Sequence, residues 1–195
     1  MSRDFRYDRQ SIRLSGYDYS TNGYYFVTIC THNRECLLGK IFDKKMELND
    51  FGKMADHGWK IIPERFSNVR LDTYQIMPNH MHLIVVINNS VGAGLSRPKI
   101  NINVDNGRDD RAPTMVKPKL GQIIAYFKYQ TTKLINGSNY KKRIWQRNYY
   151  EHIIRNEQEY FQIVNYIRTN PENWDEDKLF CRGGVIPPEN KYKCR

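Results

Sequence analysis

Two histidines spaced two residues apart give the first indication of chemistry in this chain. His80 and His82 lie in the stretch QIMPNHMHLIVVI, at the start of an apolar run that is typical of a β-strand. Because alternate residues of a strand point to the same face, both imidazoles project to one side and can share one metal ion. The histidines would then look out, away from a core under the opposite face of the strand. That opposite face is an apolar row of Met81, Leu83, Val85 and Ile87. The alternative is a pair of partly buried strand histidines without a metal.

A second polar pair lies on a predicted late helix, which Asn156 caps and Pro171 ends. At about 100° per residue, Tyr166 and Asn170 fall on one row of this helix, a single turn apart. An asparagine there offers a neutral oxygen to a hard divalent cation that already has two imidazole ligands. The helical periodicity alone is explained more simply by packing, with Tyr166 at the edge of the core and Asn170 in the last turn.

The charge of the chain is concentrated in one segment. The sequence has 31 Lys and Arg residues against 21 Asp and Glu residues, a net charge of +10, and residues 111–150 contain no acidic residue. Cations that bind phosphates and rings that stack on unpaired bases predict a surface for single-stranded or hairpin nucleic acid. A solvated basic face is the alternative. The expected contact residues are Lys117, Lys119, Lys128, Lys133, Lys141, Lys142, Arg143, Trp145, Arg147 and Tyr149.

The remaining pattern predicts the fold. Aromatic and β-branched runs predict strands at residues 24–29, 69–77, 80–87 and 145–154, with a short strand at 36–42. Helical spacing predicts helices from Asn49 to a stop at Pro63, over residues 117–135, and after Asn156. This order favours an α+β fold, a ferredoxin-like sandwich in which helices pack on one face of an antiparallel sheet.

The length of 195 residues suits one domain. We expect a basic N-terminal arm (residues 1–18), a catalytic core (19–172) with a mobile insertion at about 88–116, and a C-terminal tail (173–195). No apolar run is long enough for a membrane helix and the first residues lack a signal peptide pattern, which predicts a cytoplasmic protein. The four cysteines show no C-x-x-C spacing, and we expect reduced thiols.

The motifs MPNHMHLIVVI and YIRTNP, joined by WQRNYYEHIIRNEQEYFQIVN, resemble the single-tyrosine transposases of the HUH endonuclease superfamily. The likeness covers about residues 20–172 and is greatest to the REP-associated tyrosine transposases. Their His-hydrophobic-His pair matches His80 and His82, and their nucleophilic tyrosine matches Tyr166. Their third metal ligand is an asparagine four residues after the tyrosine, which matches Asn170, whereas the insertion-sequence enzymes usually have glutamine there.

This resemblance implies a metal-dependent single-stranded DNA transesterase, which nicks and rejoins hairpin-bearing DNA through a 5′-phosphotyrosine on Tyr166. His80, His82 and Asn170 would bind Mg²⁺ or Mn²⁺, and the enzyme would act as a monomer or a homodimer. Tyr126 and Gln130 have the same spacing on the preceding helix, but the family places its tyrosine helix after the aromatic strand. Two other functions fit the same motifs: a non-cleaving DNA hairpin-binding protein, and a metal-dependent hydrolase that acts through water.

Overall fold

A computed structural model of the chain describes residues 14, 16–89, 118–138 and 140–174. Its centre is a four-stranded sheet in the order β4-β5-β1-β6, in which every neighbouring pair is antiparallel. The strands are β1 (Gly23–Cys30), β4 (Val69–Ile76), β5 (His80–Ile87) and β6 (Tyr150–Ile154). With a helix between β1 and β4 and another between β5 and β6, this is the connection of a ferredoxin-like fold. The predicted α+β class with an antiparallel sheet is confirmed.

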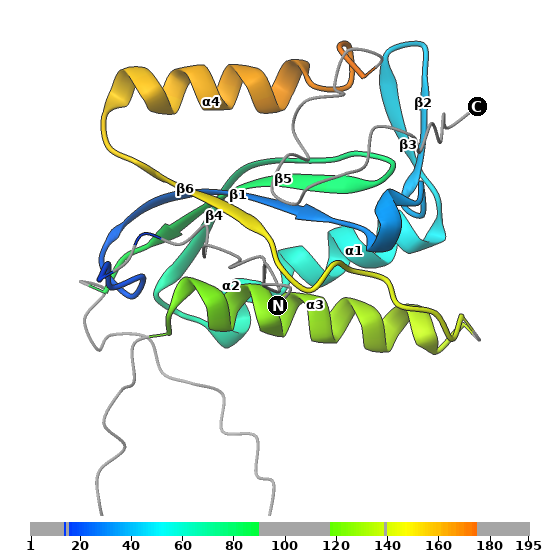
Figure 1. Cartoon of the computed structure of the whole chain (residues 1–195), viewed down its shortest axis with the longest axis horizontal. Coiled ribbons are helices and arrows are strands. Elements are labelled where there is room, and N and C mark those ends of the chain that lie inside the picture. Colours follow the sequence, from blue (N-terminus) through cyan, green and yellow to red (C-terminus); the bar gives the residue numbers. More distant parts are fainter. Residues whose placement is uncertain (1–13, 15, 90–117, 139, 175–195) are drawn as a thin grey trace, which may run out of the picture.

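Two helices and a short helical turn cover one face of the sheet (Figure 1). Helix α1 (Asp50–Lys60) begins where the Asn49 side chain accepts a hydrogen bond from the Gly52 N–H, as the sequence predicts. Pro63 lies at the start of the short helix α2 (Ile62–Arg65), a position that tolerates proline. Helix α3 (Leu120–Asn136) packs beside α1, and the main core lies between these helices and the sheet.

The opposite face of the sheet is covered by helix α4 (Glu157–Thr169) (Figure 1). Its N-terminus is capped as predicted, because the Asn156 side chain accepts from the Glu159 N–H. Val164 and Ile167 of α4 pack on Phe26 and Ile84 of the sheet, in a second and smaller core. The expectation that the helices pack on one face alone is therefore wrong. The central strands are buried on both faces, and a second helical layer provides this burial on the face of Phe26 and Ile84.

A separate two-stranded sheet lies beside the main one. It consists of β2 (Gly39–Phe42) and β3 (Lys45–Leu48), joined by Asp43 and Lys44, whose positive φ angles of 47° and 58° fit a two-residue hairpin turn. The predicted strand at residues 36–42 thus exists but does not extend the main sheet. A short 3-10 helix η1 (His32–Arg34) precedes it. Cys30 is not in a disulfide, whereas Cys36 is disulfide-bonded, so the expectation of reduced thiols is wrong for Cys36.

Most of the predicted arm, insertion and tail lies outside the described residues, which leave out 1–13, 15, 90–117, 139 and 175–195. Within the described part of the chain, no helix is both long and apolar enough to cross a membrane.

Close packing between α1 and α3 leads to a stability prediction. A Cβ added at Gly58 would lie 2.5 Å from Cγ2 of Thr131, and that side chain cannot rotate away without losing its hydrogen bonds. Its hydroxyl donates to the Phe127 carbonyl at 2.9 Å and accepts from Trp145 Nε1 at 2.8 Å. Overpacking costs about 1–3 kcal/mol, whereas alanine gains about 1 kcal/mol in helix propensity. We expect Gly58→Ala to lower the free energy of unfolding, as measured by denaturant titration.

The matched control is the double variant Gly58→Ala with Thr131→Ser, which keeps the hydroxyl and removes the methyl group. It should recover most of the lost stability. Equal loss in both variants would show that the close approach of the two helices is not the cause.

Candidate metal and tyrosine site

The two histidines of β5 face α4 and lie beneath it. Opposite them in the register of β1 are Cys30 and Thr28, and their ring nitrogens Nε2 point toward one another at 2.9 Å. His80 is 2% exposed and His82 is fully buried. The shared face is as predicted, but the expectation that the rings look out into solvent is wrong, because α4 covers them.

Nδ1 of each imidazole, the outer nitrogen that faces away from the other ring, has a polar partner. Nδ1 of His80 lies 2.7 Å from Oδ1 of Asn79, which can only accept, so this nitrogen carries the proton and Nε2 keeps its lone pair. Nδ1 of His82 lies 2.9 Å from Oγ1 of Thr28, a hydroxyl that can accept or donate. His82 can therefore present either a proton or a lone pair at Nε2. Such partners for the outer nitrogens are typical of metal-binding histidines.

Burial keeps both imidazoles neutral. It lowers the pKa of His80 to about 3, with a smaller contribution from the nearby Arg34 charge. Burial also holds the pKa of His82 well below its usual range, and the neighbouring His80 adds to this effect. Neutral imidazole is the form that binds a metal ion.

Helix α4 brings Tyr166 to this pair. Its hydroxyl lies 3.1 Å from Nε2 of His82, and the two ring centroids are 5.1 Å apart. Phe26 on β1 holds both rings, because it stacks on His82 and meets the Tyr166 ring edge to face. The phenol oxygen of Tyr166 is thus held at Nε2 of His82, although 84 residues separate the two in the chain.

Two polar contacts hold the first half of α4 on the sheet. The Tyr160 hydroxyl donates to Asp72 at 2.9 Å, at a bulge in β4 between Leu71 and Tyr74. Glu159 accepts from the Arg155 N–H at 2.8 Å and lies 2.5 Å from Nε2 of His152 on β6. Sequence reasoning missed these residues. Glu159 is three residues after the N-cap, a spacing that marks capping carboxylates and could have identified it.

Asn170 follows Tyr166 by one turn and is buried, with 2% of its surface exposed. Its Oδ1 has no hydrogen-bond partner among the described residues. Tyr166 contacts His82, and Trp174, four residues beyond Asn170, stacks on His80. Asn170 therefore lies between two residues that touch the pair, with an unsatisfied buried oxygen.

The donor set of these three side chains suits a divalent cation. Two ligand atoms at right angles on a cation with bonds of about 2.1 Å are about 3 Å apart, and the two Nε2 atoms lie 2.9 Å apart. In the described part of the chain, no cluster of three or more His, Cys, Asp or Glu side chains could hold a metal. A third ligand from the protein would accordingly be the amide oxygen of Asn170, which fits Mg²⁺ or Mn²⁺.

The other predicted pair is not brought to the histidines. Gln130 donates to the Tyr126 hydroxyl at 2.8 Å, and Tyr126 packs edge to face on Phe66. Both residues lie on α3, which covers the opposite face of the sheet. They cannot join the histidine site without a change of fold.

The predicted nucleic-acid residues divide into exposed and structural groups, and Lys117 lies outside the described residues. Trp145 is 4% exposed and donates to Thr131, so the expectation that it stacks on bases is wrong. Lys128 donates to the carbonyls of residues 146, 147 and 148, and burial lowers its pKa to about 8. Tyr149 is half-buried beside the Lys128 ammonium. The exposed cations are Lys119, Lys133, Lys141, Lys142, Arg143 and Arg147.

Part of the segment 111–150, which has no acidic residue, lies at the end of β1 that pairs with His80. The Gln146 N–H donates to the Cys30 carbonyl at 2.9 Å, and Trp145 forms a bridge with Thr31. Cys30 is also the register partner of His80 on the other side of β1. Residues 144–146 thus bond to the end of β1 that lies beside His80.

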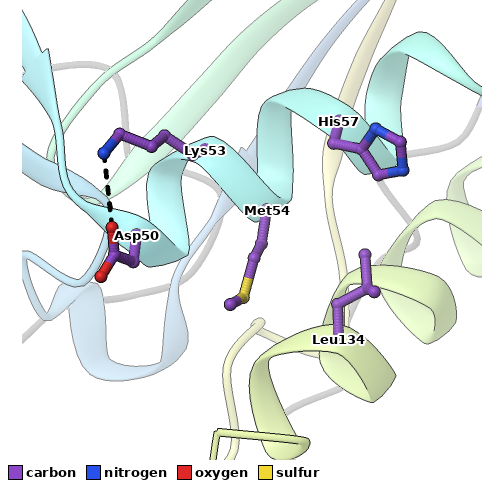
Figure 2. A pocket seen from close by; sticks show the side chains of 5 residues that line it. All are labelled: Asp50, Lys53, Met54, His57 and Leu134. Atoms are coloured by element: carbon purple, nitrogen blue, oxygen red, sulfur yellow. Dashed lines mark hydrogen bonds and ion pairs between the residues drawn. The ribbon is translucent and has the colours of Figure 1, made fainter.

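A solvent-open hollow of about 320 Å³ lies between α1 and α3 (Figure 2). Its side chains extend from α1 and α3, which cover the sheet face away from the histidines. The hollow therefore plays no part in the histidine site. It is lined by Asp50, Lys53, Met54, His57 and Leu134.

The fold is shared with a known class of protein. The chain superposes on the structure of a REP-associated tyrosine transposase bound to a REP hairpin, with a TM-score of 0.54 and 21% identity, over 83% of this chain and 73% of that chain. A candidate transposase of Deinococcus radiodurans is more distant, with a TM-score of 0.43 and 14% identity over 80% of this chain and 95% of that one. The first likeness establishes that this chain shares the fold of that transposase, and the second is too distant to add to it.

The family follows from sequence identity. An uncharacterized protein of Haemophilus influenzae (strain ATCC 51907 / DSM 11121 / KW20 / Rd) is 40% identical over 172 residues, which are 88% of this chain and 93% of that protein. The chain belongs to the same family as that protein. No family model matches the chain.

The unsatisfied oxygen of Asn170 leads to a prediction about cation binding. Mn²⁺ should raise the melting temperature of the protein. At an Mn²⁺ concentration of 100 times the dissociation constant, the added free energy of unfolding is about 2.7 kcal/mol. Asn170→Leu should lose most of this gain at the same Mn²⁺ concentration. Without metal it should melt no lower than the parent, since a buried carbonyl oxygen without a partner costs about 1–3 kcal/mol.

The control is Asn165→Ala, which changes an exposed asparagine on the same helix. It should keep the full response to Mn²⁺. An undiminished Mn²⁺ shift in Asn170→Leu would exclude Asn170 as a ligand.

Proposed function

We propose that this protein is a metal-dependent single-stranded DNA transesterase, which nicks and rejoins hairpin-bearing DNA through a 5′-phosphotyrosine intermediate. The observation that carries the proposal is the Tyr166 hydroxyl, which lies 3.1 Å from Nε2 of His82 in a pair of buried imidazoles. A half-buried tyrosine that only packs does not need its hydroxyl at a candidate metal ligand. The shared fold with a REP-associated tyrosine transposase supports the same function.

His80, His82 and Asn170 would hold Mg²⁺ or Mn²⁺ through Nε2, Nε2 and Oδ1. When bound, the cation polarises the scissile phosphate and offsets the charge that gathers on its oxygens. Asn79 and Thr28 keep the two imidazoles in the orientation that this requires, because each bonds to an outer nitrogen. The neutral state of both rings leaves their lone pairs available.

Tyr166 would act as the nucleophile. Its phenol oxygen loses a proton and forms a bond to the phosphorus, the bond from phosphorus to the 3′ oxygen breaks, and that oxygen takes up a proton to leave as a 3′-OH. An unperturbed phenol has a pKa of about 10, so it is a much better leaving group than an alkoxide. The phosphotyrosine therefore keeps the energy of the ester, and a 3′-OH can reseal the strand without ATP.

The contacts that hold Tyr166 and its helix in place suit the role of nucleophile. Phe26 packs against both Tyr166 and His82, and the Tyr160 and Glu159 contacts fix the helix that carries the tyrosine. Holding the attacking oxygen in place before the phosphate arrives lowers the entropic part of the barrier. The tyrosine needs no loop closure to reach the histidines.

We propose hairpin-bearing single-stranded DNA as the substrate. The structural neighbour is a complex with a REP hairpin. In this chain, residues 144–146 bond to the end of β1 beside His80, and exposed cations flank them in the sequence. These cations are Lys141, Lys142, Arg143 and Arg147. Phosphate contacts of this kind position a strand without reading its sequence.

The central test is formation of a covalent adduct. We expect the parent protein, incubated with Mg²⁺ and a hairpin-bearing strand labelled on the 3′ side of the cut, to migrate with the label on a denaturing gel. Tyr166→Phe removes one oxygen and keeps the ring, so it should fold, bind Mn²⁺ and bind DNA but form no adduct. Mass spectrometry of the trapped peptide locates the modified residue.

Tyr126→Phe is the matched control, because Tyr126 has the same spacing to an amide on a helix that faces away from the histidines. It should form the adduct at the parental rate. Cutting by Tyr166→Phe at the parental rate would contradict the assignment of Tyr166 as the nucleophile. DNA binding without cutting by the parent would instead indicate a hairpin-binding protein.

The position of the cationic segment leads to a prediction about salt. Each phosphate neutralised on a single strand contributes about −0.7 to the slope of log affinity against log salt. Lys141→Ala combined with Lys142→Ala should make this slope shallower by about 1–1.4. Anisotropy titrations of a labelled hairpin-bearing strand measure it.

Lys133→Ala is the comparison, since Lys133 is an exposed cation on α3, on the other side of the sheet. It should leave the slope unchanged. If Lys133→Ala flattens the slope and the double variant does not, the DNA lies over α3 instead.

A further inference from the structure

Trp174 lies against the histidine pair on the side away from Tyr166. It follows the C-terminal end of α4, and its ring is nearly parallel to that of His80, with centroids 6.1 Å apart and 26° between the planes. The other two tryptophans are buried, with Trp59 at 0% and Trp145 at 4% exposed, whereas Trp174 is half-buried. One face of the Trp174 ring is thus occupied by His80, and the ring is partly open to solvent.

A cationic residue lies in a turn beside the same histidine. Arg34 lies in the turn after Thr31, next to the residue before His80, and its charge adds to the effect of burial in lowering the pKa of His80. Its turn is fixed to the residue before His80, because the Thr31 N–H and hydroxyl each reach the Asn79 carbonyl at 2.9 Å. Asn33 and Arg34 have positive φ angles of 51° and 56°.

We propose that Trp174 and Arg34 form a subsite for the nucleotide that adjoins the scissile phosphate: the base stacks on Trp174, and the Arg34 guanidinium binds a phosphate oxygen. The inference rests on the proposed function and names residues that bind the substrate next to the reacting atoms. Tryptophan offers a flat surface to any base, and the planar fork of arginine matches phosphate oxygens. Both residues act on the strand and neither forms or breaks a bond.

Tyr166 and Trp174 contact different histidines, so the proposed subsite and the nucleophile lie on different sides of the histidine pair. Tyr166 lies at His82 and Trp174 at His80, so a strand whose phosphate reaches the histidine pair passes Trp174 on the other side from the nucleophile. The base next to the cut would then be held apart from Tyr166. Its stacking would help to fix the phosphate in line with the phenol oxygen.

The test uses tryptophan fluorescence in the non-cutting Tyr166→Phe protein, with Mg²⁺ and a short oligothymidine as probe. Stacking of a base on Trp174 should quench its emission, while the buried Trp59 and Trp145 provide a constant background. Adding Trp174→Phe should abolish the quenching and leave affinity within about threefold, since phenylalanine still stacks. Adding Trp174→Ala should weaken binding about tenfold, as measured by anisotropy of labelled DNA.

Arg34 is tested in the same background. Arg34→Gln should weaken binding about tenfold and make the salt slope shallower by about 0.7, whereas Arg34→Lys should keep the slope. Unchanged quenching in Trp174→Phe would overturn the proposal, and so would parental affinity in both Trp174→Ala and Arg34→Gln. A fall in melting temperature with normal binding and quenching would assign both residues to packing and also overturn it.

Failure of the subsite and failure of the proposed function give different results. The fluorescence assay needs no cleavage, so quenching that depends on Trp174 supports the subsite even if no adduct forms. An adduct on Tyr166 in the parent, together with quenching that is indifferent to Trp174, overturns the subsite alone.

Discussion

The contact between two neutral, buried imidazoles is the interaction on which the rest of this structure depends. The inner nitrogens of His80 and His82 lie 2.9 Å apart inside the protein. Two lone pairs cannot face each other there unless a proton or a cation lies between them. Thr28 can bond either form of His82, so the pair is suited to exchange the proton for a metal ion. Phe26, Asn79 and Tyr166 contact the two rings, and the unsatisfied oxygen of Asn170 follows Tyr166 by one turn.

The two faces of the sheet serve separate purposes. The face under α1 and α3 holds the larger apolar core and supplies most of the burial. The face under α4 can therefore accommodate two imidazoles, a threonine and an asparagine in a much smaller core. Helix α4 is fixed there by polar contacts at Tyr160 and Glu159 as well as by Val164 and Ile167. A helix fixed in this way brings Tyr166 to the central strands of the sheet.

Much of the fold could be predicted from local patterns, because alternation and capping act over a few residues. The strands around His80, the caps at Asn49 and Asn156, and the shared face of His80 and His82 all follow from such patterns. The burial of individual side chains could not be predicted, because the sequence of one strand does not show what packs above it. For this reason His80, His82 and Trp145, which were expected to be exposed, are buried. The bulge at Asp72 that receives Tyr160 also depends on tertiary contacts alone.

The central proposal is that one divalent cation binds between the two imidazoles and the amide of Asn170, the C-cap of α4. Anomalous diffraction from a crystal of the protein soaked in Mn²⁺ tests this claim most directly, because it locates the metal and its ligands without an activity assay. The account predicts a single strong peak bonded to Nε2 of His80, Nε2 of His82 and Oδ1 of Asn170. A histidine pair that stays closed at saturating Mn²⁺, or a peak bonded elsewhere, would contradict it.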